Sequence, residues 1–83
     1  MTETRFFIYG RSNCPFCIMA CDLLSASQDN YIFFDHVGDE ETLKYLKEFY
    51  NHTTFPMVLK NDLSSGVTKF IGGYTDLLEE KGV

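Results

Sequence analysis

The feature that most constrains the fold of this chain is a pair of cysteines, Cys14 and Cys17, just after an apolar run at 6–9. The run Phe-Phe-Ile-Tyr predicts a buried strand. Pro15 suits the first turn of a helix, because its missing N–H is not needed there. The positive end of that helix favours a thiolate at Cys14, and Cys17 follows one turn later. A strand that leads into C-x-x-C at a helix start therefore favours redox chemistry of the two thiols.

The rest of the chain predicts alternating strands and helices in one small α/β domain that spans residues 1–83. We expect Thr75 or Asp76 to cap the last helix. A β-α-β start implies two parallel strands, and a closing hairpin adds two antiparallel ones. The predicted fold is βαβαββα, a four-stranded mixed sheet with helices on both faces. Apolar periodicity and the Gly, Pro and Asn positions place strands at 5–9, 31–36, 55–59 and 67–71, and helices at 15–27, 39–50 and 75–80.

Charge and composition exclude several classes of partner. The net charge is −5, from 12 acidic and 7 scattered basic residues, which argues against binding to nucleic acid or anionic membranes. No apolar run approaches the roughly 20 residues of a membrane span, and no signal-peptide pattern precedes the first strand. Three cysteines, an odd number, argue against a secreted scaffold held by disulfides. We therefore expect a soluble cytoplasmic protein, and a monomer.

A structural zinc site is the main alternative use of the cysteine pair. Zinc takes four ligands, and beyond the pair the sequence offers only Cys21, His36 and His52. We therefore expect no metal. A second alternative is that Cys14 and Cys17 are inert core residues, and the position of the pair directly after a strand disfavours it. Cys21 lies four residues after Cys17 on the same helix face, which predicts a small core residue; a regulatory disulfide is the less favoured alternative. We expect both histidines at the surface or at strand ends, outside the chemistry.

With these elements in place, the chain resembles a dithiol glutaredoxin, a small glutathione-dependent member of the thioredoxin-like fold. The resemblance covers nearly the whole chain and rests on three motifs in order. The run Arg-Ser-Asn-Cys-Pro-Phe-Cys at 11–17 is similar to the family's basic residue followed by C-P-Y-C. Thr54-Phe55-Pro56 is similar to T-V-P, whose proline is cis in the family. The run Gly-Gly-Tyr-Thr-Asp-Leu at 72–77 is close to G-G-x-x-D-L.

The resemblance implies a glutathione site beside the catalytic residues, Cys14 and Cys17. The backbone of Phe55 would bind the cysteinyl part of glutathione, and Arg11 the glycyl carboxylate. N–H groups at the start of the last helix would receive the γ-glutamyl carboxylate, and Asp76 its ammonium group. Each residue also has an ordinary role, such as a surface charge for Arg11 and a helix cap for Asp76. The implied glutathione-binding residues are Arg11, Phe16, Thr54, Phe55, Pro56, Gly73, Thr75 and Asp76.

The sequence departs from the family pattern at positions that bear on affinity. Phe16 replaces the usual Tyr and removes a hydroxyl near Cys14. Thr53 stands where many members carry Arg, Lys or Gln in contact with the glycyl carboxylate. Ile18 and Met19 stand where basic residues often follow the second cysteine. Because the net charge is −5, we predict weaker binding of glutathione than in basic relatives.

The resemblance implies a glutathione-dependent oxidoreductase. Cys14 would attack protein–glutathione disulfides, and Cys17 would resolve disulfides with dithiol substrates such as ribonucleotide reductase. One alternative is a redoxin reduced by thioredoxin reductase, although such redoxins typically lack the Gly-Gly and Asp of the glutathione site. Another is a carrier of a glutathione-ligated [2Fe–2S] cluster, which Pro15 and Cys17 argue against. Thioredoxin itself is disfavoured because the chain has no Trp.

Overall fold

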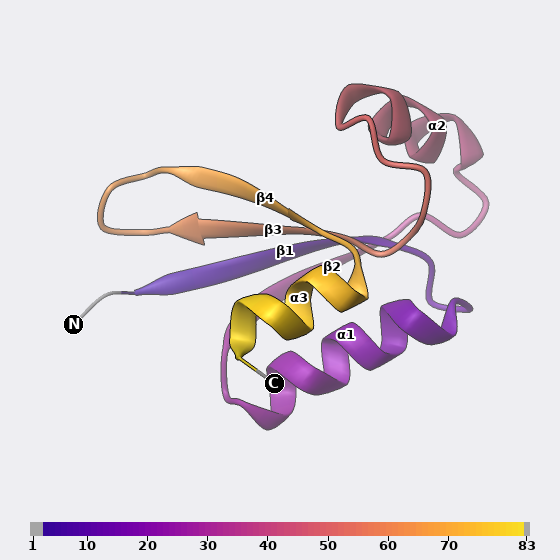
Figure 1. Cartoon of the computed structure of the whole chain (residues 1–83). Coiled ribbons are helices and arrows are strands. Elements are labelled where there is room, and N and C mark those ends of the chain that lie inside the picture. Colours follow the sequence, from indigo (N-terminus) through magenta and orange to yellow (C-terminus); the bar gives the residue numbers. More distant parts are fainter. Residues whose placement is uncertain (1–2, 83) are drawn as a thin grey trace.

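The computed structural model describes residues 3–82 and has the βαβαββα order that the sequence predicts (Figure 1). The predicted domain limits, 1 and 83, lie outside the described residues. The elements are β1 (Thr4–Gly10), α1 (Pro15–Ala26), β2 (Asn30–Asp35), α2 (Glu40–Phe49), β3 (Met57–Asp62), β4 (Thr68–Gly72) and α3 (Tyr74–Lys81). Most predicted boundaries lie within two residues of the observed ones. The differences at the starts of β3 and α3 concern the site and are described below.

The four strands form one mixed sheet in the order β2-β1-β3-β4. The central strand β1 runs parallel to β2 and antiparallel to β3, and β3 and β4 form an antiparallel hairpin. Helices α1 and α3 lie together on one face of the sheet, and α2 stands on the other side (Figure 1). The predicted thioredoxin-like architecture, with helices on both faces, is confirmed.

The core lies between the sheet and the layer formed by α1 and α3. Alternation along β1 turns Phe6 and Ile8 toward these helices, where both are almost completely buried. They pack with Ala20 and Leu24 of α1, and Val58 and Leu77 complete the cluster. Because burial of such an aliphatic or aromatic side chain is worth about 1.5–3 kcal/mol, this cluster anchors α1, and with it both cysteines, to the sheet.

The third strand begins later than the sequence predicts. The prediction places it at 55–59, but β3 starts at Met57 and continues to Asp62. The bond between Phe55 and Pro56 is cis, as the resemblance implied, and Pro56 is buried with no N–H to donate to a neighbouring strand. Residues 53–56 therefore form a loop at the end of the sheet next to Cys14.

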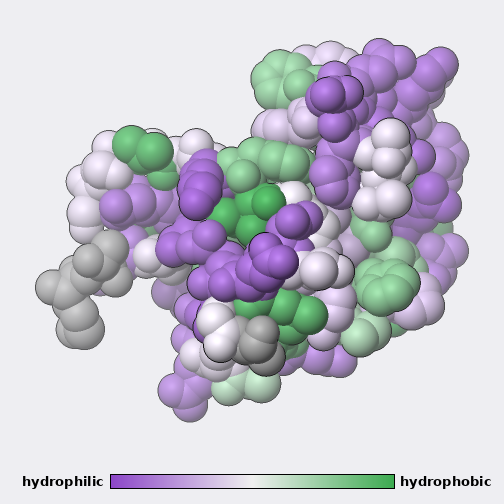
Figure 2. Space-filling view, in the orientation of Figure 1, coloured by the Kyte–Doolittle hydropathy of each residue, from purple (hydrophilic) through white to green (hydrophobic). Residues whose placement is uncertain are grey.

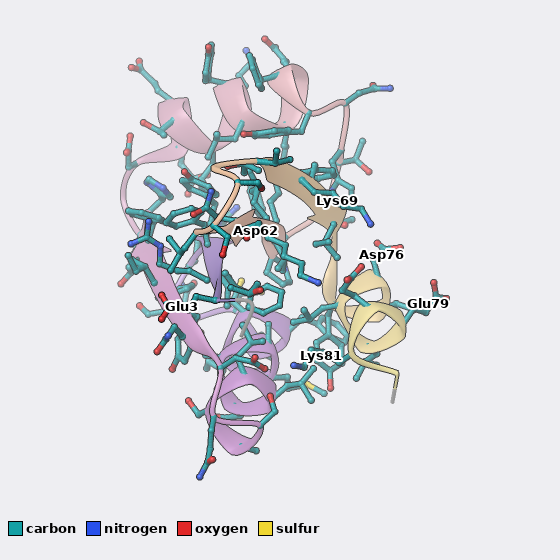
Figure 3. All side chains as sticks on the ribbon, turned by 90° about the vertical axis from the view of Figure 1, so that its left-hand side faces the viewer. Glu3, Asp62, Lys69, Asp76, Glu79 and Lys81 are labelled. Atoms are coloured by element: carbon teal, nitrogen blue, oxygen red, sulfur yellow. The ribbon has the colours of Figure 1, made fainter. Side chains whose placement is uncertain are left out.

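The start of α3 also differs from the prediction. Neither Thr75 nor Asp76 is the cap residue, because the helix begins at Tyr74 with Gly73 at the N-cap. Asp76 occupies the third helical position, and its Oδ2 accepts a hydrogen bond of 2.9 Å from the N–H of Gly73. The carboxylate thus stabilises the helix from inside its first turn. Figure 3 shows Asp76 at the end of α3 nearest to β4.

Ion pairs tie the far end of α3 to the rest of the molecule. Lys81 pairs with Asp29 in the loop after α1. Glu80 accepts from Lys60 of β3 at 2.9 Å and lies 3.6 Å from Lys69 of β4. The neighbouring Glu79 points away from the molecule (Figure 3). These contacts fix α3 against the sheet, so that its first turn has a defined position near the cysteines.

Helix α2 is strongly amphipathic. Its exposed face is mostly hydrophilic in the space-filling view (Figure 2), and Leu43 and Leu46 are its buried residues. Asp39 caps its start, and its Oδ1 accepts from the N–H of Thr42 at 3.4 Å. Between residues 3 and 82, no helix is long and apolar enough to cross a membrane.

Candidate functional site

Two adjoining pockets lie where the segment that joins β1 to α1, the loop at 53–56 and the start of α3 meet. The pocket beside Cys14 has a volume of about 470 Å³, and the one at α3 about 370 Å³. Both are lined by Thr54 and Phe55, so together they form one continuous groove. The first pocket is also lined by Arg11, Asn13, Cys14 and Thr53, and the second by Phe16, His52, Gly73, Tyr74, Thr75 and Asp76.

The groove contains most of the residues that the resemblance implies for glutathione. Seven of the eight line one or both pockets, and the remaining one, Pro56, is buried directly after Phe55. Phe16 is 55% exposed, and its ring centroid lies 6.0 Å from that of Tyr74 across the groove. The structure therefore brings together three motifs that are far apart in sequence, and their role in binding glutathione stays a prediction.

Cys14 and Cys17 lie in different environments at the start of α1. Cys14 is the N-cap residue and is half-buried. Its N–H donates to the carbonyl of Arg11, and its carbonyl accepts from the N–H of Ile18, both at 3.1 Å. Cys17 is fully buried. Cys14 is therefore the more accessible of the two thiols.

Burial controls the protonation of the second thiol. It raises the pKa of Cys17 to about 12, and the hydrogen bond that this thiol makes with Cys14 adds to the shift. At neutral pH, Cys17 therefore keeps its proton and donates to the sulfur of Cys14.

We expect the stability of the reduced protein to fall at alkaline pH because of Cys17. The pKa is about 12 in the folded state against an ordinary value of 9.0, so the folded state holds the proton more tightly. The resulting stabilisation is complete below pH 9.0 and is lost as the pH rises toward 12. Denaturant unfolding between about pH 8 and about pH 10.5 should show a smaller pH dependence for Cys17→Ala. Equal pH dependence in the two proteins would contradict this.

Gly10, the last residue of β1, makes room for the thiol of Cys17. A Cβ at this position would come far inside van der Waals contact with Sγ of Cys17, and 3.5 Å from its Cβ. The backbone of Gly10 has no positive φ, so the space for Cys17 is what requires a glycine here. The end of the first strand and the second cysteine are therefore packed as one unit.

We predict that Gly10→Ala destabilises the protein by about 1–3 kcal/mol through overpacking against Cys17. Denaturant unfolding of Gly10→Ala, Cys17→Ala and the double variant forms the test. The substitution at Gly10 should cost less than about 1 kcal/mol when Cys17 is already Ala, because the clashing sulfur is then absent. An equal cost in both backgrounds would show that the sulfur is not what excludes a side chain.

Gly72 and Gly73 fulfil different requirements at the start of α3. Gly72 has φ 122°, a conformation that residues with a side chain rarely adopt, and a Cβ there would lie 2.8 Å from Cγ of Asp76. Gly73 has an extended backbone, and its N–H is already bound by Asp76. The pair of glycines therefore lets the carboxylate of Asp76 fold back over the chain at the edge of the groove.

Two cations lie near the ring of Phe55, a residue that lines the groove. The guanidinium carbon of Arg11 is 5.9 Å from the centroid of the Phe55 ring, and Nζ of Lys47 is 5.0 Å from it. Arg11 also forms an ion pair of 3.5 Å with Glu40. Lys47 and Glu40 were not predicted, because α2 and the loop at 53–56 meet only in the folded chain. The positive charges near the groove therefore come from two elements.

His52, which we expected at the surface or at a strand end and outside the chemistry, lies partly exposed beside the groove. The residue lines the pocket at α3, and its Nδ1 lies 2.9 Å from the carbonyl oxygen of Thr54. Because a carbonyl can only accept, Nδ1 is the donor in this contact. The ring also packs edge-on against Phe70, with 5.6 Å between centroids. Its position two residues before Thr54 was the only signal in the sequence.

The remaining cysteine and histidine lie away from the groove. Cys21 is half-buried and packs against the core, as predicted, and burial raises its pKa. His36 stacks on Tyr9 with 6.0 Å between the ring centroids, and its Nδ1 is 3.3 Å from Asp39. Within 3–82, no three His, Cys, Asp or Glu side chains gather closely enough to hold a metal ion.

Solved structures of glutaredoxins resemble this fold. The solution structure of a dithiolic glutaredoxin from Trypanosoma brucei brucei has a TM-score of 0.69 and 26% identity, and the match covers 93% of this chain and 78% of that one. The solution structure of a glutaredoxin from Brucella melitensis has a TM-score of 0.67 and 28% identity, and the match covers 99% of this chain and 83% of that one. The crystal structure of glutaredoxin 1 from Francisella tularensis has a TM-score of 0.65, and the match covers 96% of this chain and 94% of that one. Because the identity is only 17%, this structure supports the fold alone.

The sequence itself also matches a family. No curated protein gives a significant match. The model of the glutaredoxin family, however, matches residues 6–63, which is more than half of the chain and includes both cysteines and the loop at 53–56. With the paired cysteines at the start of α1 and the thioredoxin-like sheet, this match leads to one conclusion: the chain belongs to the glutaredoxin family.

Proposed function

We propose that this protein is a glutathione-dependent thiol–disulfide oxidoreductase that reduces glutathione mixed disulfides and protein disulfides. Family membership supports the general redox role. The dependence on glutathione rests on one observation, the groove that runs from Arg11 past Cys14 to Asp76. It has a cation at one end, a helix start at the other and a half-buried sulfur between them.

Glutathione would lie along this groove in an extended form. Its cysteinyl part would pair with the backbone of Phe55 beside Cys14, in the manner of a short added strand. The γ-glutamyl end would reach the start of α3, where free N–H groups favour its carboxylate and Asp76 its ammonium group. The glycyl carboxylate would lie near Arg11. This orientation places the ligand's sulfur next to Cys14.

The monothiol reaction uses Cys14 alone. Its thiolate attacks the glutathionyl sulfur of a mixed disulfide, so that a Cys14–glutathione disulfide forms and the substrate leaves as a thiolate. The thiolate of a second glutathione then attacks the sulfur of that bound glutathione. Oxidised glutathione leaves, and the Cys14 thiolate is restored. Each turnover therefore consumes one free glutathione, and the other half of the oxidised glutathione comes from the glutathionyl group of the substrate.

Reduction of a protein disulfide also uses Cys17. Attack by Cys14 gives a mixed disulfide with the substrate, and Cys17 then attacks the sulfur of Cys14 as it gives up its proton. The Cys14–Cys17 disulfide forms, and the fully reduced substrate leaves. Two glutathiones reduce this disulfide in turn. Dithiol enzymes such as ribonucleotide reductase are substrates of this type, and we propose that the protein acts on them as a cytoplasmic monomer.

The test is turnover of a small glutathione mixed disulfide in the presence of glutathione, coupled either to glutathione reductase or to thioredoxin reductase. We expect turnover only with the first couple. Turnover driven by thioredoxin reductase without glutathione would favour the alternative redoxin. Purification of a brown dimer after reconstitution with iron and glutathione would instead favour the [2Fe–2S] carrier.

A further inference from the structure

The cation next to Cys14 is already engaged within the protein. Arg11 pairs at 3.5 Å with Glu40, the first residue of α2. The Glu40 side chain is 66% exposed and that of Arg11 is 35% exposed, so an anion from solution can reach the same guanidinium. Any carboxylate that binds Arg11 must therefore compete with Glu40.

A second cation approaches the same groove without a carboxylate partner. Lys47, in the last turn of α2, takes part in none of the ion pairs within residues 3–82. Its Nζ lies over the ring of Phe55, on which the guanidinium of Arg11 also lies. Lys47 does not itself line the pocket beside Cys14, but the ring that it contacts, Phe55, does. The neutral Thr53 in the same pocket provides no charge.

We propose that Glu40 and Lys47 set the affinity and the charge selectivity of the groove for the terminal carboxylate of its thiol ligand. Glu40 acts as an intramolecular competitor that occupies Arg11 in the free protein. Lys47 supplies a second cation at the ring of Phe55. The groove thus prefers thiols that end in a free carboxylate. Glu40 makes this preference weaker than Arg11 and Lys47 alone would make it. This inference rests on the proposed function.

Simpler roles exist for both residues, and matched variants separate them. Glu40 lies in the first turn of α2 and Lys47 in its last, where each charge also suits the helix dipole. Glu41 shares the first turn with Glu40 and is exposed, but it has no ion-pair partner within 3–82. Lys44 is an exposed lysine of the same helix and likewise forms no ion pair there. Glu41→Gln and Lys44→Gln therefore change the net charge by the same amounts as Glu40→Gln and Lys47→Gln.

The experiment measures KM for a glutathione mixed disulfide in the wild type, in Glu40→Gln and Lys47→Gln, and in the controls Glu41→Gln and Lys44→Gln. An exposed ion pair is worth up to about 1 kcal/mol, so we expect Glu40→Gln to lower KM about two- to fivefold. Lys47→Gln should raise KM by about the same factor. The controls should stay close to the wild type, and kcat should change little in every variant.

A second substrate identifies the charge that is recognised. In the mixed disulfide of glutathione monoethyl ester, the glycyl carboxylate is neutral, so the effects of Glu40→Gln and Lys47→Gln should disappear. Equal effects with both substrates, or equal shifts in the control variants, would overturn this inference and leave the proposed function intact. Absence of turnover in the wild type with both substrates would overturn both.

Discussion

Replacing Cys14 by Ser should lower the turnover of a glutathione mixed disulfide by roughly a thousandfold or more, since the thiolate is the nucleophile. A serine hydroxyl at the same N-cap position is not ionised at neutral pH. Cys17 cannot take over, because it is fully buried and its pKa is raised to about 12. The measurement is the rate of the coupled glutathione reductase assay.

Two controls show whether the loss at Cys14 is chemical. Cys21→Ser removes a thiol from the same helix, outside the groove, and should leave turnover close to the wild-type value. Cys14 is half-buried and belongs to no core cluster, so Cys14→Ser should unfold at nearly the wild-type denaturant concentration. Substantial turnover by a folded Cys14→Ser variant would show that another group attacks the substrate.

Replacing Cys17 by Ser should separate the two reactions that share Cys14. Turnover of a glutathione mixed disulfide should stay within about threefold of the wild type, because that cycle needs one thiolate. Reduction of a protein disulfide should fall by roughly a hundredfold or more, because no buried thiol then resolves the mixed disulfide. The third cysteine, Cys21, is one turn further along α1 and packs against the core, so it does not replace Cys17.

The measurement for Cys17→Ser compares the two substrates in one preparation. Mass spectrometry should also find the Cys14–substrate disulfide accumulating in this variant, whereas the wild type passes through it. A parallel loss of both activities would contradict the separate roles, provided that the variant remains folded. Loss of neither activity would show that glutathione itself resolves the protein mixed disulfide fast enough.

The fold could be predicted because its signals are local. Apolar runs bounded by Gly, Pro and Asn mark each strand, and Pro15 and Asp39 mark two helix starts. The predicted starts of β3 and α3 were wrong for identifiable physical reasons. Pro56 has no N–H and lies before β3, so the predicted strand was too early. The start of α3 follows from the φ of Gly72 and the inward turn of Asp76, neither of which the spacing of residues specifies.

The candidate site was predictable only in part. Its three motifs are short, ordered and individually recognisable, and the fold brings them together at one end of the sheet. His52, Lys47 and Glu40 carry no such signal, because their significance depends on which side chains α2 and the loop at 53–56 bring to Phe55 and Arg11. The raised pKa of Cys17 likewise follows from burial that no spacing determines.

The position of β1 in the sheet has a consequence for synthesis on the ribosome. This strand is synthesised before both of its neighbours, and it pairs with β2 on one edge and with β3 on the other. Its second edge stays open until residues 57–62 have left the exit tunnel. An unpaired apolar edge is prone to wrong strand pairing. The nascent chain is therefore most vulnerable to aggregation in the interval between β2 and β3, when both cysteines have already emerged.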